Sequence, residues 1–273
     1  MARRPGPSLR SRLRGRLPPL RRVLAAVGAG AIAAVLVALL NGPWLRVDEV
    51  AWDGERYTDG DDLATVLGQA RGVSVLAVDT TALAAALERL PAVADATVDA
   101  ALPGGLHATV VERTPAFVWQ TSSARLLCAA DGTIFAALPL DGALPEAQRG
   151  LPVIDDQRRR ARLITVGDVI PAGFVEVAGH LAAIDAAALG SSATAIAVRI
   201  DETYGFQVVA DRPGWRIAFG FYDADPEASA ANLGGRVEDQ VAAVRTLFAA
   251  EPETSIAWVD ARNPGKVYFR AKG

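Results

Sequence analysis

The sequence is poor in the residues that form disulfides and metal sites. Cys128 is the only cysteine among 273 residues, so an intramolecular disulfide is impossible. His107 and His180 are the only histidines, and neither has a second histidine or cysteine at the spacing of a metal site. We therefore predict no metal and no other cofactor, a buried and unreactive Cys128, and two histidines that are structural or solvated.

Catalytic signatures are also missing. The chain has no Gly-x-Ser-x-Gly motif and no glycine-rich nucleotide-binding loop. Acidic residues gather at Asp59-Gly60-Asp61-Asp62, but the alternating ligands and distant glutamate of a calcium loop are absent, so a helix N-terminus explains this segment better. These absences favour a binding module over an enzyme.

Charged residues are absent from positions 23–40, whereas eight arginines and no acidic residue lie in the first 22 positions. At 1.5 Å per residue the apolar run forms roughly 27 Å of helix, close to the ~30 Å hydrocarbon core of a bilayer. We predict a disordered basic tail over residues 1–22 and a transmembrane signal anchor over residues 23–43. A cleaved signal peptide is less favoured, because Asn41-Gly42-Pro43-Trp44 supplies no small-x-small cleavage site.

The charge distribution predicts the orientation and excludes one class of ligand. Arginine before the span places the N-terminus in the cytoplasm, with Arg21 and Arg22 at one interface of the lipid bilayer and Trp44 at the other. Eight of the 28 basic residues lie in the tail, so the rest of the chain carries 20 basic against 31 acidic residues. An acidic outer part argues against nucleic acid as a ligand.

Residues 46–115 show a β-α-α-β-β pattern. Residues 47–52 alternate like a half-buried strand, and helices are expected after Thr58 or Asp59 and again after Asp79, while residues 73–78 between them read as extended. Strands at 94–101 and 106–113 follow. The glycines of Leu102-Pro103-Gly104-Gly105 permit the positive φ of a tight hairpin between them.

Four motifs mark this region: Leu90-Pro91-x-Val93, Ala96-x-Val98, the Leu102-Pro103 turn and Val110-Val111-Glu112-Arg113-x-Pro115. In this order, and directly after a basic tail and one span, they resemble the polypeptide-transport-associated (POTRA) domain of the bacterial FtsQ/DivIB cell-division family. Downstream, the Asp131-Gly132 hairpin, Leu151-Pro152-Val153-Ile154 and Val259-Asp260-Ala261-Arg262 are similar to the β domain of the same family.

Residues 116–273 are predicted to form this β domain around a mixed antiparallel sheet. The periodicity indicates helices near 174–189 and 237–249 and strands near 117–120, 125–128, 134–137, 195–200, 206–210, 215–219, 255–259 and 266–270. The expected fold class is therefore α+β, with a single N-terminal transmembrane helix, a POTRA domain and a β domain.

The resemblance implies a non-catalytic divisome scaffold in the cell membrane at the division septum. Its implied partners are FtsB and FtsL, with a link to the septal peptidoglycan synthases FtsW and FtsI. The implied partner-binding residues lie on the last strand and the turn before it: Asn263, Lys266, Val267, Tyr268 and Phe269. An exposed sheet edge near the C-terminus can be extended by another chain, although an ordinary strand protected by Lys266 and Arg270 is the alternative.

Two other functions stay open. POTRA domains also occur in outer-membrane assembly and secretion components, but too few residues remain here for their C-terminal barrel. A signal-anchored cell-wall enzyme would need a catalytic side chain in a cleft. We further expect Glu112-Arg113 to link the two domains, and the arginine-rich segment 158–162 to be a solvated loop, with contact to headgroups or cell wall as the alternative.

Overall fold

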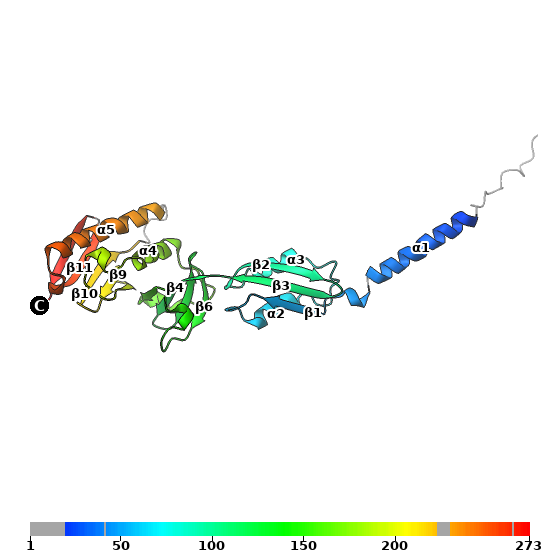
Figure 1. Cartoon of the computed structure of the whole chain (residues 1–273), viewed down its shortest axis with the longest axis horizontal. Coiled ribbons are helices and arrows are strands. Elements are labelled where there is room, and N and C mark those ends of the chain that lie inside the picture. The colour runs from blue at the N-terminus through cyan, green and yellow to red at the C-terminus, as the bar shows by residue number, and fades with distance from the viewer. Residues whose placement is uncertain (1–19, 41, 223–229, 264) are drawn as a thin grey trace, which may run out of the picture.

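The computed structural model describes residues 20–40, 42–222, 230–263 and 265–273. The protein is elongated: helix α1 lies at one end, a three-stranded sheet with two helices in the middle, and a nine-stranded sheet at the other end, where the chain terminates (Figure 1). Most of the predicted basic tail, residues 1–19, lies outside the described residues.

The helix α1 (Leu20–Leu40) is followed by a short 3-10 helix, η2 (Pro43–Leu45), which contains the exposed Trp44. Pro43 stands at the first position of η2, where its missing N–H has no intrahelical partner to lose. Within the described part of the chain, no helix combines the length and the apolar character needed to cross a membrane.

The three-stranded sheet confirms the predicted β-α-α-β-β order. Its elements are β1 (Glu49–Asp53), α2 (Gly60–Gly68), α3 (Thr80–Leu87), β2 (Val93–Ala101) and β3 (Gly105–Glu112). Strand β3 lies in the centre, parallel to β1 and antiparallel to β2. Asp59 and Asp79 cap the helices, as predicted, by accepting from the N–H groups of Asp61 and Ala82.

Two local predictions in this unit are wrong. Neither Gly104 nor Gly105 has a positive φ, and the turn instead contains a cis Leu102–Pro103 peptide bond. Gly104 is needed for a close approach, because a Cβ there would lie 2.5 Å from the carbonyl oxygen of Arg46. Residues 73–78 form no strand, only an isolated bridge between Ser74 and Arg46.

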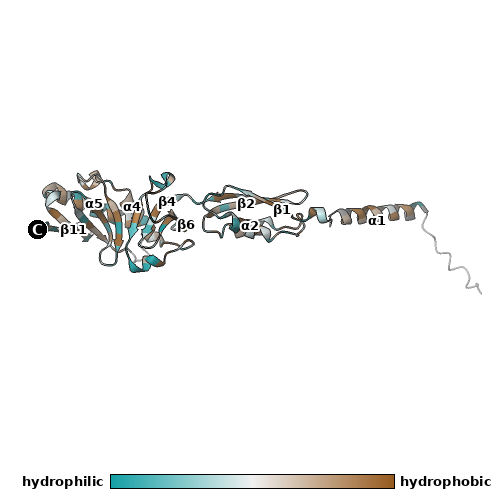
Figure 2. Ribbon diagram, turned by 90° about the horizontal axis from the view of Figure 1, so that it is seen from below, coloured by the Kyte–Doolittle hydropathy of each residue, from teal (hydrophilic) through white to brown (hydrophobic). Residues whose placement is uncertain are grey.

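The nine-stranded sheet has the order β12-β11-β10-β9-β8-β7-β4-β5-β6. Its strands are β4 (Pro115–Thr121), β5 (Arg125–Ala129), β6 (Ile134–Leu138), β7 (Val153–Asp156), β8 (Ala197–Asp201), β9 (Gly205–Ala210), β10 (Trp215–Gly220), β11 (Ile256–Asn263) and β12 (Lys266–Ala271). The pairs β4–β7, β7–β8 and β10–β11 are parallel and the other neighbours antiparallel, so the predicted mixed sheet is confirmed. Figure 2 shows hydrophobic and hydrophilic residues alternating along these strands.

Two α-helices pack against this sheet: α4 (Ala172–Ala182) and α5 (Ala230–Ala250). The helix predicted over 174–189 is thus split into α4 and a 3-10 helix, η5 (Ala187–Leu189). Buried Gln240 fixes α5 to the sheet, since its Nε2 donates to the carbonyl oxygens of Phe219 on β10 and Ala261 on β11. Strands β10 and β11 are therefore held under α5, and β12 extends the sheet beyond them.

Candidate partner-binding site

Strand β12 is the outermost strand of the nine-stranded sheet and pairs antiparallel with β11. Among the described residues, no strand pairs with its other side. Of the five predicted partner-binding residues, four lie on β12, and Asn263 is the last residue of β11. All of them except Val267 are exposed. Tyr268 is 60% and Phe269 44% exposed, large fractions for aromatic side chains.

The hydrogen-bond register identifies which backbone groups of β12 point outward. The N–H of Lys272 donates to the carbonyl oxygen of Ser255, so Lys272 points its backbone toward β11. At both irregularities in the pairing of β11 with β12, the additional residue lies on β11. Backbone groups along β12 therefore still alternate regularly between pointing toward β11 and pointing toward the open edge. Val267, Phe269 and Ala271 therefore direct their N–H and C=O groups to the open edge.

The side chains of β12 divide between the two faces of the sheet. Val267 packs against the hydrophobic core and, with Leu247 of α5, lines a shallow hollow. Phe269 lies opposite buried Val259 on the same face, whereas Tyr268 lies opposite Asp260 on the other. A chain added to β12 would therefore meet an aromatic side chain on each face.

The face away from α5 carries an aromatic and arginine cluster that the sequence did not reveal as a unit. Trp258 lies 5.5 Å from Tyr204 between ring centroids, and Arg270 lies 6.0 Å above the Trp258 ring. The guanidinium of Arg262 is held by Asp260, and this hydrogen bond lowers the pKa of Asp260. The alternation of charge in residues 266–270 indicated an exposed face, but the partners of Arg270 and Trp258 in this cluster come from distant segments, with Tyr204 in the turn before β9.

A second cluster joins the three-stranded unit to the large sheet. Both carboxylate oxygens of Glu112, at the end of β3, accept from the N–H of Tyr57, and Oε1 also accepts from the N–H and hydroxyl of Thr58. Arg113 donates to the carbonyl oxygen of Pro91 at 3.0 Å and pairs with Asp131 of the β5–β6 turn. This pair of charged residues therefore has the architectural role predicted for it.

Aromatic packing reinforces the junction. The Tyr57 ring lies edge-on to Phe135 of β6 with centroids 5.4 Å apart, and the Tyr57 hydroxyl accepts from Nε2 of buried Gln148 at 3.0 Å. Ala92 and Val118 belong to the same buried cluster. A small hydrophobic core thus spans the boundary between the two units and restricts their relative motion.

Glu112→Gln should lower the free energy of unfolding at neutral pH by about 1 kcal/mol, because it weakens charge-assisted hydrogen bonds at a half-exposed site. Burial raises the pKa of Glu112, but the hydrogen bonds, led by the Thr58 hydroxyl, outweigh this effect and lower it. The carboxylate therefore stabilises the folded state above its unfolded pKa of about 4.3, and this contribution is lost as the pH falls through the folded pKa. Thermal melts across this range measure it, and a gap between the two proteins that stays constant on acidification would contradict the assignment.

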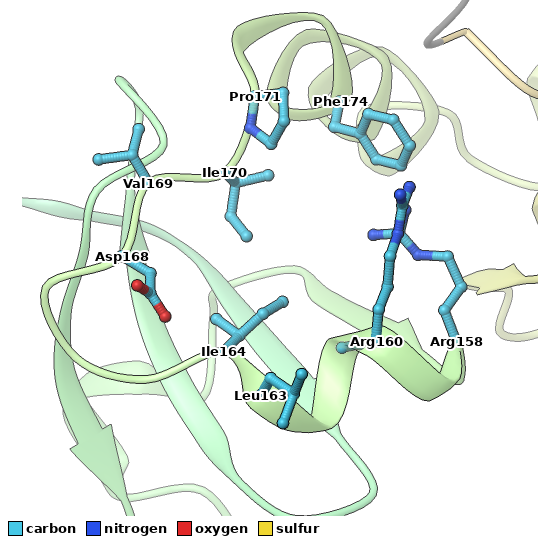
Figure 3. Close-up of a pocket in the computed structure, with 10 residues that line it drawn as sticks. Arg158, Arg160, Leu163, Ile164, Asp168, Val169, Ile170, Pro171 and Phe174 are labelled. Carbon is cyan, nitrogen blue, oxygen red and sulfur yellow. The ribbon is translucent and has the colours of Figure 1, made fainter.

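The arginine-rich segment differs in part from the solvated loop that was predicted. Residues Arg159–Leu163 form a 3-10 helix, η4, and Arg158 just before it is buried, with its guanidinium on Asp156 and 4.5 Å from the centre of the Phe174 ring. Figure 3 shows the hollow beside it, with Arg158 and Phe174 on one side and Leu163 and Val169 across from them. Arg159, Arg160 and Arg162 are exposed, so the solvated character predicted for this segment fails only at Arg158 and Ala161.

The cysteine and the two histidines, the side chains most suited to catalysis or metal binding, lie within or beside regular secondary structure. Cys128 is fully buried in β5, and burial raises the pKa of its thiol to about 12, which confirms the unreactive thiol. His107 on β3 lies 2.9 Å from a carboxylate oxygen of Asp53 on the neighbouring strand β1. His180 lies on α4 with Glu176 one turn before it. In the described residues, no three histidine, cysteine or acidic side chains gather as a metal site would require.

The three residues predicted at membrane interfaces lie at the two ends of α1. Arg21 is exposed in its first turn, and the side chain of Arg22 lies outside the described part. Trp44 follows the helix in η2 and is 53% exposed.

Comparison with known proteins matches residues 45–113 to the family described as "POTRA domain, FtsQ-type". The cell division protein FtsQ of Mycobacteroides abscessus is 28% identical over 159 residues, which cover 58% of this chain and 51% of that protein. The cell division protein FtsQ of Anaeromyxobacter sp. (strain K) is 29% identical over 204 residues, which cover 74% of this chain and 66% of that protein. The chain thus spans about half the length of one relative and just under two thirds of the other.

These comparisons confirm the resemblance to the FtsQ/DivIB family that the motifs indicated. The match to this POTRA family covers residues 45–113, and the POTRA domain predicted from the sequence covers residues 46–115. Both relatives are named as cell division proteins.

Proposed function

We propose that this chain, an FtsQ/DivIB-type protein by its POTRA domain and its relatives, is a non-catalytic scaffold of the divisome. In this proposal β12 receives an extended segment of FtsB, paired with FtsL, as an added antiparallel or parallel strand. The observation that carries the proposal is the open edge of β12, with outward backbone groups at Val267, Phe269 and Ala271.

Charge favours an acidic partner segment. The chain has two lysines: Lys266 is exposed on this strand together with Arg270, whereas the ammonium of Lys272 donates to the carbonyl oxygen of Pro213 in the turn before β10. The outer part of the chain is otherwise acidic, so the edge is a local basic strip. Complementary charge raises the association rate and selects the partner, while Tyr268 and Phe269 supply the apolar contacts.

The remaining parts have supporting roles in the same proposal. The apolar run at residues 23–40, after eight arginines, supports a single membrane anchor with a cytoplasmic N-terminus. Residues 116–273 then form an extracytoplasmic FtsQ-type β domain. The POTRA domain serves recruitment to the septum, and FtsB and FtsL connect the scaffold to FtsW and FtsI.

The proposal predicts that Phe269→Asp and Tyr268→Ala each weaken binding of the FtsB–FtsL pair at least tenfold, because both remove an aromatic anchor at the edge. Binding of the full chain in detergent, measured by titration against the purified pair, checks this. Val111→Asp is the matched control, since Val111 is 53% exposed on the POTRA domain and remote from β12. Unchanged affinity in both edge variants with native melting profiles would overturn the site, and no binding by the unmodified chain would overturn the function.

A further inference from the structure

Figure 1 shows which end of the POTRA domain adjoins α1. Three segments that meet at this end each carry a large exposed apolar side chain. Trp44 is 53%, Leu76 59% and Leu102 69% exposed. They come from three separate segments: η2, the loop between α2 and α3, and the turn between β2 and β3. Together these three residues form what we call the apolar tip.

Backbone contacts hold the three segments together. Arg46 forms an antiparallel bridge with Ser74, and the N–H of Val75 donates to the carbonyl oxygen of Leu45, so the loop that carries Leu76 lies beside the segment that follows Trp44. Gly104 lies against the backbone oxygens of Trp44 and Arg46, which places the Leu102-Pro103 turn beside them. The apolar tip is therefore a defined part of the fold.

A short tether fixes the distance of the tip from α1. Trp44 lies four positions after Leu40, the last residue of α1, and four steps of extended chain span at most about 14 Å. Residues in η2 rise only about 2 Å each, which shortens the span further. The headgroup layer of one leaflet is roughly 5–8 Å thick. In the proposed function the anchor at residues 23–43 ends in this layer, so the short tether keeps the tip close to it.

We propose that the apolar tip inserts into the headgroup layer of the lipid bilayer and sets how the POTRA domain stands on the membrane. The inference rests on the membrane anchor of the proposed function. Tryptophan favours the membrane interface, leucine contributes apolar contact, and exposed Arg46 beside Trp44 suits lipid phosphate. Asp48, also exposed, lies further along the chain toward β1 and limits how deep the tip can sit.

Site-specific fluorescence tests this contact in the full chain reconstituted into phospholipid vesicles. Cys128 is fully buried, so a thiol-reactive environment-sensitive fluorophore would label an introduced cysteine selectively. Leu102→Cys and Leu76→Cys report on the tip, and Val111→Cys is the control, because Val111 is similarly exposed near the far end of β3. Lipids with a spin label near the headgroup quench only fluorophores that lie in that layer.

We expect the lipids to quench the labels at positions 76 and 102 several-fold more strongly than the label at 111. Equal, weak quenching at all three positions would overturn the inference. Flotation of the same vesicles after an alkaline wash separates the two proposals. If the protein floats with the vesicles but the labels at positions 76 and 102 stay unquenched, the anchor is present and the tip does not contact the membrane. If the protein does not float, the membrane anchor itself is refuted.

Discussion

Asp156→Ala should lower the free energy of unfolding by about 3–5 kcal/mol, because it leaves the buried guanidinium of Arg158 without its counter-charge. Asp156 is 1% and Arg158 8% exposed, and the guanidinium binds both carboxylate oxygens, at 2.9 and 2.7 Å. Nε1 of buried Trp119 also donates to Asp156, at 3.2 Å. Chemical denaturation of the purified chain measures the change.

The neighbouring pair Arg159–Glu202 provides the control. Its side chains are 87% and 45% exposed, so Glu202→Ala should lower the free energy of unfolding far less than Asp156→Ala. Adding Arg158→Met to Asp156→Ala should recover part of the loss, since methionine removes the unpaired charge and keeps apolar contact with Phe174. Equal effects of Asp156→Ala and Glu202→Ala would show that the buried pair has no special role.

The POTRA domain could be predicted from the sequence because its signals are local. Asp59 and Asp79 each stand just before a helix, and Leu63 and Leu67 repeat at helical spacing, so propensity, capping and burial agree. The turn at Leu102-Pro103 was misread, because the need for glycine at position 104 comes from the backbone of Arg46, far away in the sequence. Close approach between distant segments leaves no local pattern.

Periodicity predicted eight strands of the nine-stranded sheet, but neither β7 nor the order of the strands. Strand β7 lies between β4 and β8 with parallel pairing on both sides, which no periodicity in residues 153–156 encodes. Arg158 was read as solvated because a run of arginines usually is. It is buried because Asp156 at the end of β7 neutralises it and Phe174 of α4 covers it.

At the candidate partner-binding site, too, some features could be predicted from the sequence and others could not. Position near the C-terminus and the pattern of residues 266–270 indicated an edge strand, and the structure places β12 there. The backbone groups that face outward, Ala271 among them, depend on the two irregularities in the β11–β12 ladder. The tilted contact of Trp258 with Tyr204 depends on a turn about fifty residues earlier in the chain. Neither can be read from the sequence.

Phe269→Pro should weaken binding of the FtsB–FtsL pair more than Phe269→Ala, because only proline removes the outward N–H of position 269. Loss of the aromatic anchor in both variants is expected to cost roughly 2 kcal/mol. In the proline variant, the partner carbonyl left unpaired adds about 1–3 kcal/mol. Proline is tolerated at an edge position whose N–H faces solvent, so the fold should persist.

Tyr268→Pro is the matched control for the direction of the backbone. The backbone of Tyr268 points toward β11 and lies opposite Asp260, so proline there removes a ladder hydrogen bond and should lower the melting temperature, which Phe269→Pro leaves nearly unchanged. Isothermal titration of each variant against the purified pair, with a thermal melt of the same samples, separates the two effects. Equal affinities for Phe269→Pro and Phe269→Ala would mean that the partner contacts the aromatic side chains without adding a strand to β12.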